Sequence, residues 1–287
     1  MNNNRYSIVI PAYNEEDAIG KVLEEIFGGE MKDRCEVIVV DDHSRDGTLE
    51  RARKYPVTVL HNLQNFGYGY SLKRGITQAV EDHIIILDAD GSYPVAALSA
   101  LIAEYEKGFH MVVGARQGVH YHGSLLKRIA RVSFRFLSEF ATGRRIPDIN
   151  SGCRVFRKDL SMRFFHTLSS GFSFTTTVTL AFMLNAYSVH YIPIEYHKRA
   201  GFSKVNHIRD TLRSLQIIVE AILFYNPIKI FLLCAIAVFL AGVACAVLAL
   251  VAPVLAMIIF FAIALSVLVM ALGFIGVLLK FMHNDSN

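Results

Sequence analysis

The sequence predicts an α/β fold with a mostly parallel sheet, followed by amphipathic helices and a pair of membrane-spanning helices. Over the first two thirds of the chain, short apolar runs alternate with segments of helical periodicity, as in strand–helix–strand units. Two of these runs end in carboxylates, at Asp41-Asp42 and at Asp88-Ala89-Asp90. Nearer the C-terminus, Ile230 to Leu279 contains no Asp, Glu, Lys or Arg. That length fits two spans of roughly 20 apolar residues each.

The first half of the chain alternates strand and helix. The expected strands are Tyr6–Ile10, Cys35–Val40, Val57–Leu60 and His83–Leu87; the expected helices begin at Asn14 or Glu15, near Thr48 and at Ser71. Such alternation favours parallel strands joined by right-handed crossovers. Because the carboxyl ends of parallel strands meet at one edge, we expect Asp42, Asp88 and Asp90 to surround one crevice.

Asp88 and Asp90 have two interpretations. They are oxygen ligands of the kind that a hard divalent cation prefers, and such a cation is suited to carrying a diphosphate. Alternatively, they only cap a helix that starts near Pro94. The second strand that ends in acids at the same predicted edge favours the cation site.

The next part of the domain adds basic groups. A helix from Pro94 to Lys107 precedes a strand from His110 to Gly114, which leads to Arg116. Residues 124–141 form a basic amphipathic helix, a pattern typical of segments that lie on an anionic membrane surface and also of a charged face on a core helix. Later expected elements are a turn-rich loop at 148–154, strands at 154–157 and 189–194, and a basic loop at 196–204.

The C-terminal part predicts attachment to a membrane. We expect a cytoplasmic catalytic domain at 1–206, a juxtamembrane amphipathic helix at 207–227, a region of two spans at 228–280 (228–251 and 254–279) and a tail at 281–287. Arg209, Arg213, Lys229 and Lys280 flank the hairpin, and its tip is uncharged. Basic residues favour the cytoplasmic side, so both termini are expected there.

Composition excludes several classes of protein. The net charge of +4 is too small to indicate a nucleic-acid partner. The four cysteines, Cys35, Cys153, Cys234 and Cys245, form no CxxC pair, so a disulfide framework or zinc site is not expected. The apolar hairpin could pair with copies of itself, so a homo-oligomer is one of the possible states.

Six motifs in this order resemble family 2 glycosyltransferases of the GT-A fold, and within them the dolichol-phosphate mannose synthase group of polyprenyl-phosphate glycosyltransferases. The motifs are Ile10 to Glu15, Val39 to Thr48, Asp88 to Gly91, Gly114 to Arg116, Asp148 to Arg154 and Arg199 to Lys204. The resemblance implies a Rossmann-like GT-A catalytic domain that uses Mg²⁺ or Mn²⁺. It also implies transfer of a hexose, with inversion, from a GDP-mannose or UDP-glucose type of donor to a dolichyl or undecaprenyl phosphate.

The resemblance also implies roles for individual residues. Asp88, Asp90 and Arg116 would be catalytic, with Asp90 and Asp88 toward the metal. The nucleotide sugar would contact these three and also Pro11, Tyr13, Glu15, Val40, Asp42, Ala89, Arg199 and Lys204. The lipid phosphate would contact Arg131, or Arg128 instead, together with Ser151.

The chemistry of the acceptor separates the subgroups. A sugar hydroxyl is a poor nucleophile and needs a general base, whereas a lipid phosphate is already anionic. The chain contains no Trp, so the Gln-x-x-Arg-Trp motif of membrane-bound processive members is absent, and so is a Thr-Glu-Asp stretch. Both observations favour a phosphate acceptor. The alternatives are a transferase that acts on a glycolipid or glycan hydroxyl and a non-catalytic membrane protein that binds nucleotide sugars.

Overall fold

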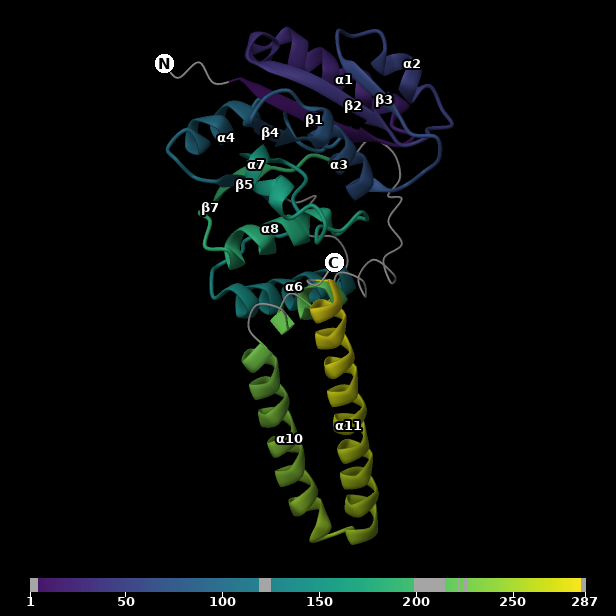
Figure 1. Cartoon of the computed structure of the whole chain (residues 1–287), viewed down its shortest axis with the longest axis vertical. Coiled ribbons are helices and arrows are strands. Elements are labelled where there is room, and N and C mark those ends of the chain that lie inside the picture. The colour runs from purple at the N-terminus through teal and green to yellow at the C-terminus, as the bar shows by residue number, and fades with distance from the viewer. Residues whose placement is uncertain (1–4, 119–124, 199–214, 221, 224–226, 285–287) are drawn as a thin grey trace. The chain divides into compact units, whose positions relative to one another are not determined.

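The computed structural model describes residues 5–118, 125–198, 215–220, 222–223 and 227–284, and of residues 125–131, 227, 277–278, 280–284 only the backbone. The chain divides into two compact units, Met1–Leu215 and Gln216–Asn287. Figure 1 shows the elements of each.

The first unit is an α/β domain. Its strands are β1 (Tyr6–Ala12), β2 (Cys35–Asp41), β3 (Thr58–His61), β4 (His83–Ile86), β5 (Met111–Gln117), β6 (Arg154–Arg157) and β7 (Val189–Glu195). Its helices are α1 (Glu16–Gly28), the 3₁₀ turn η1 (Glu30–Asp33), α2 (Thr48–Ala52), α3 (Tyr68–Gln78), α4 (Ala97–Tyr105), α6 (Leu125–Thr142), α7 (Lys158–Arg163) and α8 (Phe174–Leu184).

In the described part of the chain these strands form one sheet in the order β3-β2-β1-β4-β6-β5-β7. The pairs β3–β2, β2–β1, β1–β4 and β5–β7 are parallel, which confirms the predicted mostly parallel α/β sheet. β6 is antiparallel to both of its neighbours, β4 and β5. It therefore runs against the rest of the sheet and brings the loop before it, residues 148–153, to the edge where β4 ends.

Helices cover both faces of the sheet (Figure 1). On one face, α1 and α4 bury apolar side chains such as Ile19 and Leu101 against Ile8 and Ile85. On the other face, α3 and α8 pack against Val9 and the rest of a second apolar cluster. Full burial of each such side chain stabilises the fold by roughly 1.5–3 kcal/mol. These two layers fix the sheet, and with it the strand ends that carry the candidate site.

Several helix boundaries differ from those predicted. α3 begins at Tyr68 and not at Ser71, because Gly67, with φ of +99°, makes the turn and its carbonyl accepts a hydrogen bond from Ser71 N–H. α4 begins at Ala97, three residues after the expected start at Pro94. The basic helix expected at 124–141 is α6, Leu125–Thr142.

The second unit contains α10 (Pro227–Ala249) and α11 (Pro253–Asn284), which turn at residues 250–252 (Figure 1). Ile228–Ala249 and Pro253–Gly276 are each long and apolar enough to cross a membrane. The helices contact each other through Phe231 and Phe274, whose ring centroids lie 5.6 Å apart. α11 continues to Asn284, beyond the predicted end of the second span. Before α10, residues 215–220 and 222–223 are helical.

Candidate active site

Asp88 and Asp90 follow β4 at the edge of the sheet where β1 and β2 also end. Val9 of β1 lies opposite Ile86 of β4, and Ala12 of β1 lies opposite Asp41 of β2. The carboxyl ends of three adjacent parallel strands thus meet, which is where open α/β sheets bind ligands. The capping interpretation does not hold, because the N-cap of α4 is Ala96 and no side chain in the described part of the chain caps that helix.

Asp88 is held between two other elements. Its Oδ1 accepts a hydrogen bond of 2.8 Å from the hydroxyl of Tyr68, at the start of α3. Burial, followed by the charge of Asp88, raises the pKa of Tyr68 well above its ordinary value, so this hydroxyl stays a donor. On the other side lies Gly152, where an added Cβ would stand 2.5 Å from Cγ of Asp88. The backbone before β6 can approach the carboxylate this closely because residue 152 has no side chain.

Asp90 is 7% exposed. Its Oδ1 accepts hydrogen bonds from Ser92 N–H (3.0 Å) and from Ser92 Oγ–H (2.6 Å). Gly91 between them has φ of +69°, a conformation that a side chain would strain. The carbonyl of Ser92 in turn accepts a hydrogen bond of 2.9 Å from His197 N–H, two residues after β7. Hydrogen bonds therefore hold the loop of Asp90 together and connect it to the residues that follow β7.

The two carboxylates fit a divalent cation that arrives with a diphosphate. Among the described residues, no three His, Cys, Asp or Glu side chains are grouped as a metal cage. Mg²⁺ in phosphate-transfer sites does not need one, since it is bound by one or two carboxylates while water and substrate phosphates supply the other ligands. Asp88 and Asp90 supply that number of acids at the strand edge.

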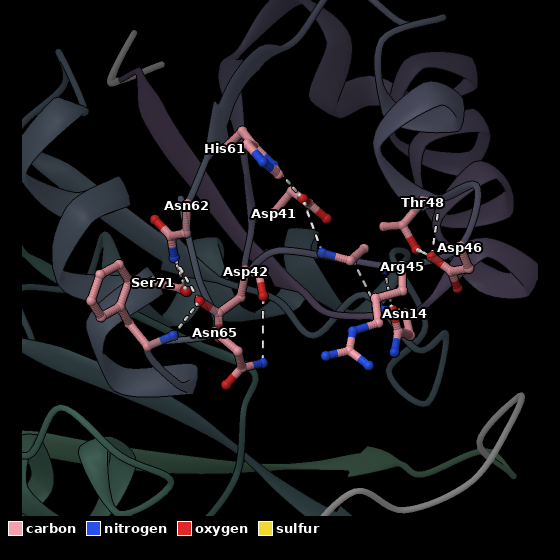
Figure 2. Close-up of polar contacts among 12 residues, drawn as sticks. Asn14, Asp41, Asp42, Arg45, Asp46, Thr48, His61, Asn62, Asn65 and Ser71 are labelled. Carbon is pink, nitrogen blue, oxygen red and sulfur yellow. Dashed lines mark hydrogen bonds and ion pairs between the residues drawn. The ribbon is translucent and has the colours of Figure 1, made fainter.

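Asp42 fastens the turn that leads into α3. Its Oδ1 accepts hydrogen bonds from Asn62 Nδ2 (2.7 Å) and from Phe66 N–H (3.0 Å), and its Oδ2 accepts one from Gly67 N–H (2.8 Å), as Figure 2 shows in part. The side chain is buried. The expected contact of Asp42 with a nucleotide stays a prediction. The observed hydrogen bonds show that Asp42 orders the turn between β3 and α3.

Its neighbour Asp41 is fully buried and pairs with His61 across the β2–β3 ladder (Figure 2). Oδ2 of Asp41 lies 2.7 Å from Nδ1 of His61 and accepts a further hydrogen bond of 3.3 Å from Ser44 N–H. These contacts were not expected from the sequence, where Asp41 and His61 stand on separate strands. They join the ends of β2 and β3 beside the carboxylate edge.

The loops after β1 and β2 interlock (Figure 2). Asn14 N–H donates to Ser44 Oγ (2.9 Å), and Arg45 N–H donates to Asn14 Oδ1 (2.7 Å). Glu15 N–H donates to Thr48 Oγ1 (2.8 Å). The sequence motifs around Glu15 and around Asp42 to Thr48 therefore lie together, after the paired ends of β1 and β2.

Asp46 holds the second of these loops. It accepts hydrogen bonds from the N–H and hydroxyl of Thr48 and from Glu16 N–H. Burial alone would raise the pKa of Asp46, but these hydrogen bonds outweigh it and hold the pKa below its ordinary value. Asp46 is thus a carboxylate that orders the start of α2.

Three other residues expected at the nucleotide sugar lie in the sheet or its edge. Pro11 and Val40 are buried partners in the β1–β2 register, and Ala89 is 2% exposed. Tyr13 is half-buried, and Glu15 is 9% exposed. Their contacts with a nucleotide stay predictions.

Arg116, at the end of β5, is bound by a carboxylate for which the sequence predicted no role. Its Nε donates to Asp148 Oδ2 (2.7 Å), and its Nη2 donates to Asp148 Oδ1 (2.8 Å). The side chains are 16% and 4% exposed. The guanidinium also lies over the ring of Tyr196, with Cζ 5.4 Å from the centroid. This bidentate pairing and stacking fix the orientation of Arg116 beside the strand edge.

Arg154 is the second unassigned group. It has no exposed area, and its guanidinium donates to the carbonyls of Ile149, Ser151 and Thr175 and to Thr179 Oγ1. Burial lowers its pKa from the ordinary value. Arg154 thus links the 148–152 loop to α8 by hydrogen bonds. It thereby fixes the position of the backbone at Gly152, which lies against Asp88.

The roles expected of five further residues also remain predictions. Ser151 has no exposed area, and its hydroxyl donates to the Gly114 carbonyl (2.6 Å), so contact with a lipid phosphate would require this loop to open. Arg128 and Arg131 lie on α6, in the part where only the backbone is described. Arg199 and Lys204 lie outside the described residues.

The family model described as "Glycosyl transferase family 2" matches residues 7–165. The dolichyl-phosphate hexose transferase of Haloferax volcanii is 30% identical over 203 residues, which is 70% of this chain and 86% of that protein. An undecaprenyl-phosphate 4-deoxy-4-formamido-L-arabinose transferase of Pseudomonas fluorescens is 33% identical over a region that covers 54% of this chain and 47% of that protein. The dolichol-phosphate mannosyltransferase of Pyrococcus furiosus is 31% identical over 39% of this chain and 33% of its own.

Solved structures share the fold. Glucosyl-3-phosphoglycerate synthase from Mycobacterium tuberculosis in complex with UDP has a TM-score of 0.61 at 16% identity, over 76% of this chain and 80% of that one. The same enzyme with Mn²⁺, UDP and glucosyl-3-phosphoglycerate gives 0.59 at 18% identity over the same shares. The motifs, the mostly parallel sheet and these matches agree, and the chain belongs to glycosyltransferase family 2.

Proposed function

We propose that this glycosyltransferase moves a hexose from a nucleoside-diphosphate sugar, of the GDP-mannose or UDP-glucose type, to a polyprenyl phosphate with inversion. The observation that carries the proposal is the pair of carboxylates, Asp88 and Asp90, at the edge where β1, β2 and β4 end. The acceptor class is supported by relatives whose names include dolichyl-phosphate and undecaprenyl-phosphate transferases.

On the donor side, Asp88 and Asp90 would hold Mg²⁺ or Mn²⁺ against the diphosphate. A bound cation would supply neutralisation of the charge that develops on the leaving nucleoside diphosphate. The related fold crystallised with Mn²⁺ and UDP supports metal dependence in the family. Tyr68 and Ser92 keep the two carboxylates oriented before substrate arrives. The interlocked loops that contain Glu15 and Asp42 would form the wall for base and ribose.

On the acceptor side, the nucleophile is an oxygen of the lipid phosphate. It forms a bond to the anomeric carbon while the bond from that carbon to the diphosphate oxygen breaks. The electron pair leaves with the nucleoside diphosphate, and no proton has to move. Because the acceptor is already an anion, the chain need only position and desolvate it, which accounts for a site without a required general base. Arg116, fixed by Asp148, would face the developing charge.

The acceptor lipid places this reaction at a membrane. We propose that α10 and α11 are two spans, that residues 1–206 form a cytoplasmic catalytic domain and that both termini are cytoplasmic. The support is the length and apolarity of the two helices, together with the basic residues that flank them. On α6, Val132 and Phe136 are exposed apolar side chains, as a helix at a membrane surface would have.

The experiment that tests this function is a transfer assay with a panel of donors. Purified full-length protein in detergent is incubated with Mn²⁺ or Mg²⁺, a polyprenyl phosphate and each of several radiolabelled GDP- and UDP-hexoses. We expect one donor to label the lipid. Labelling by none of them would contradict the proposal and favour a non-catalytic protein. In a parallel reaction with a glycan or glycolipid in place of the polyprenyl phosphate, labelling of a hydroxyl would favour the other transferase class.

A further inference from the structure

Ser92 makes a double contact with one acid of the candidate metal site. Both of its donors, the backbone N–H and the hydroxyl, reach the same oxygen, Oδ1 of Asp90, at 3.0 and 2.6 Å. Neither donor is exposed, since Ser92 has 0% relative accessible area. Rotation of the Asp90 carboxylate would break both hydrogen bonds in a place that water does not reach, so the contact fixes the rotamer of Asp90.

The burial of Ser92 also restricts what else its hydroxyl can do. A side chain with no accessible area does not meet a metal ion or a substrate in this conformation. The hydroxyl hydrogen is directed to Asp90, and the next residue, Tyr93, is also buried and accepts a hydrogen bond of 2.8 Å from Gly152 N–H. The group therefore acts on the site through Asp90.

The backbone of Ser92 is fixed independently of its side chain. Its carbonyl accepts the hydrogen bond from His197 N–H (2.9 Å), and its own N–H remains bound to Asp90. Gly91 supplies the left-handed φ of +69° that turns the chain back. A Ser92→Ala substitution should therefore remove one hydrogen bond from the carboxylate and leave the loop in place.

We propose that Ser92 is a positioning residue that holds Asp90 in its metal-binding orientation. This inference rests on the metal site of the proposed function. A carboxylate that is already oriented loses less freedom when the cation binds, and loss of a hydrogen-bonding partner of a metal ligand typically lowers metal affinity or activity about 10- to 100-fold. Ser92 thus sets the affinity for the cation without contacting it.

The test measures Mn²⁺ binding directly, by electron paramagnetic resonance of the full-length protein with UDP or GDP and without lipid. Ser92→Ala should raise the Kd for Mn²⁺ by about tenfold or more. Ser92→Cys, which keeps the shape of the side chain but has a larger atom and a weak donor, should also raise it. The matched control is Ser161→Ala on α7, because Ser161 is equally buried and its hydroxyl donates to the Lys158 carbonyl. That variant should bind Mn²⁺ like the wild type.

A second comparison separates positioning from general damage. In an Asp90→Asn background, Ser92→Ala should cause no further loss of Mn²⁺ affinity, because the serine acts through the carboxylate. An unchanged Kd in Ser92→Ala and Ser92→Cys would overturn the inference and leave the proposed function intact. The inference would also be overturned if Ser92→Ala raised the Kd for Mn²⁺ by the same factor in the wild-type and Asp90→Asn backgrounds. A wild-type protein that binds no Mn²⁺ would instead overturn the metal site itself, and with it this role.

Discussion

The hydroxyl of Tyr68 donates a hydrogen bond of 2.8 Å to Oδ1 of Asp88, joining the first residue of α3 to the loop that follows β4. Helix and strand are separate elements, and this contact holds the first acid of the Asp88-Ala89-Asp90 stretch from outside its own loop. On the other side, Gly152 lets the backbone before β6 approach the same carboxylate. Asp88 is therefore oriented by the fold before any substrate binds.

Replacement of Tyr68 by Phe should lower kcat about tenfold. The ring stays in place, but the carboxylate loses a charge-assisted hydrogen bond worth about 1.5 kcal/mol. The measurement is the rate of sugar transfer at saturating donor. The control is Tyr191→Phe, since the buried hydroxyl of Tyr191 has no hydrogen-bond partner among the described residues. Equal rates in wild type and Tyr68→Phe would show that the contact does not serve catalysis.

The bidentate pair of Arg116 and Asp148 should be strongly coupled. A double-mutant cycle with Arg116→Ala and Asp148→Ala should give a coupling free energy of at least about 1.5 kcal/mol in the unfolding of detergent-solubilised protein. Arg157 and Asp159 form a matched pair whose side chains are 48% and 44% exposed. That exposed pair should couple by less than about 1 kcal/mol. Similar values for the two pairs would contradict the special role of burial at Arg116.

The stability of the protein should be sensitive to the loss of even one hydrogen-bond partner of the buried Arg154. Thr179→Val removes the hydroxyl that accepts from Nη1 at 2.9 Å, inside α8. We expect a loss of about 1–3 kcal/mol in the free energy of unfolding, because a charged donor is left less satisfied without access to water. Thr167→Val is the control, since the Thr167 hydroxyl is exposed and bonds only locally to the Phe164 carbonyl. A Thr179→Val protein as stable as that control would contradict this account of the loop.

His83 makes stability depend on pH. Burial lowers the pKa of His83 below its ordinary value of 6.5, so the folded state favours the neutral ring, whose Nδ1 lies 3.0 Å from the Tyr105 hydroxyl. The stability that His83 contributes is complete above pH 6.5 and is lost as the pH falls through its lower folded-state pKa. Melting temperatures measured between pH 7.5 and 5 should fall less steeply for His83→Gln. Parallel curves for the two proteins would refute this assignment.

The sequence predicted the elements of the fold better than their directions. The apolar run before Asp88 and the one before Asp41 predicted parallel strands, because such strands are covered on both faces and read as continuous apolar segments. Residues 154–157 predicted a strand but not that β6 is antiparallel to β4 and β5. Direction depends on the path of the whole segment between Gln117 and Arg154, and no local pattern encodes it.

The candidate site divides in the same way. The carboxylates at strand ends were predictable, since residues that follow parallel strands share one edge. The partners that orient them were not: Tyr68 stands 20 positions before Asp88, and Arg116 stands 32 before Asp148. Polar pairs at such separations depend on tertiary packing. An Asp followed by Ser two positions later, as in Asp90 and Ser92, is a local signal that could have been used, because short polar side chains often close such turns.

Two acceptors that differ only in the phosphate distinguish transfer to a phosphate oxygen from transfer to a hydroxyl. Full-length protein with its preferred labelled donor and Mn²⁺ is given either a polyprenyl phosphate or the polyprenol of the same chain length. We expect label in the phosphate lipid alone, in a product that mild acid cleaves, and no label with the Asp90→Asn variant. Three results would contradict transfer to a lipid phosphate at a metal site held by Asp90: transfer to the polyprenol hydroxyl, a product that is stable to mild acid, or full activity of the Asp90→Asn variant.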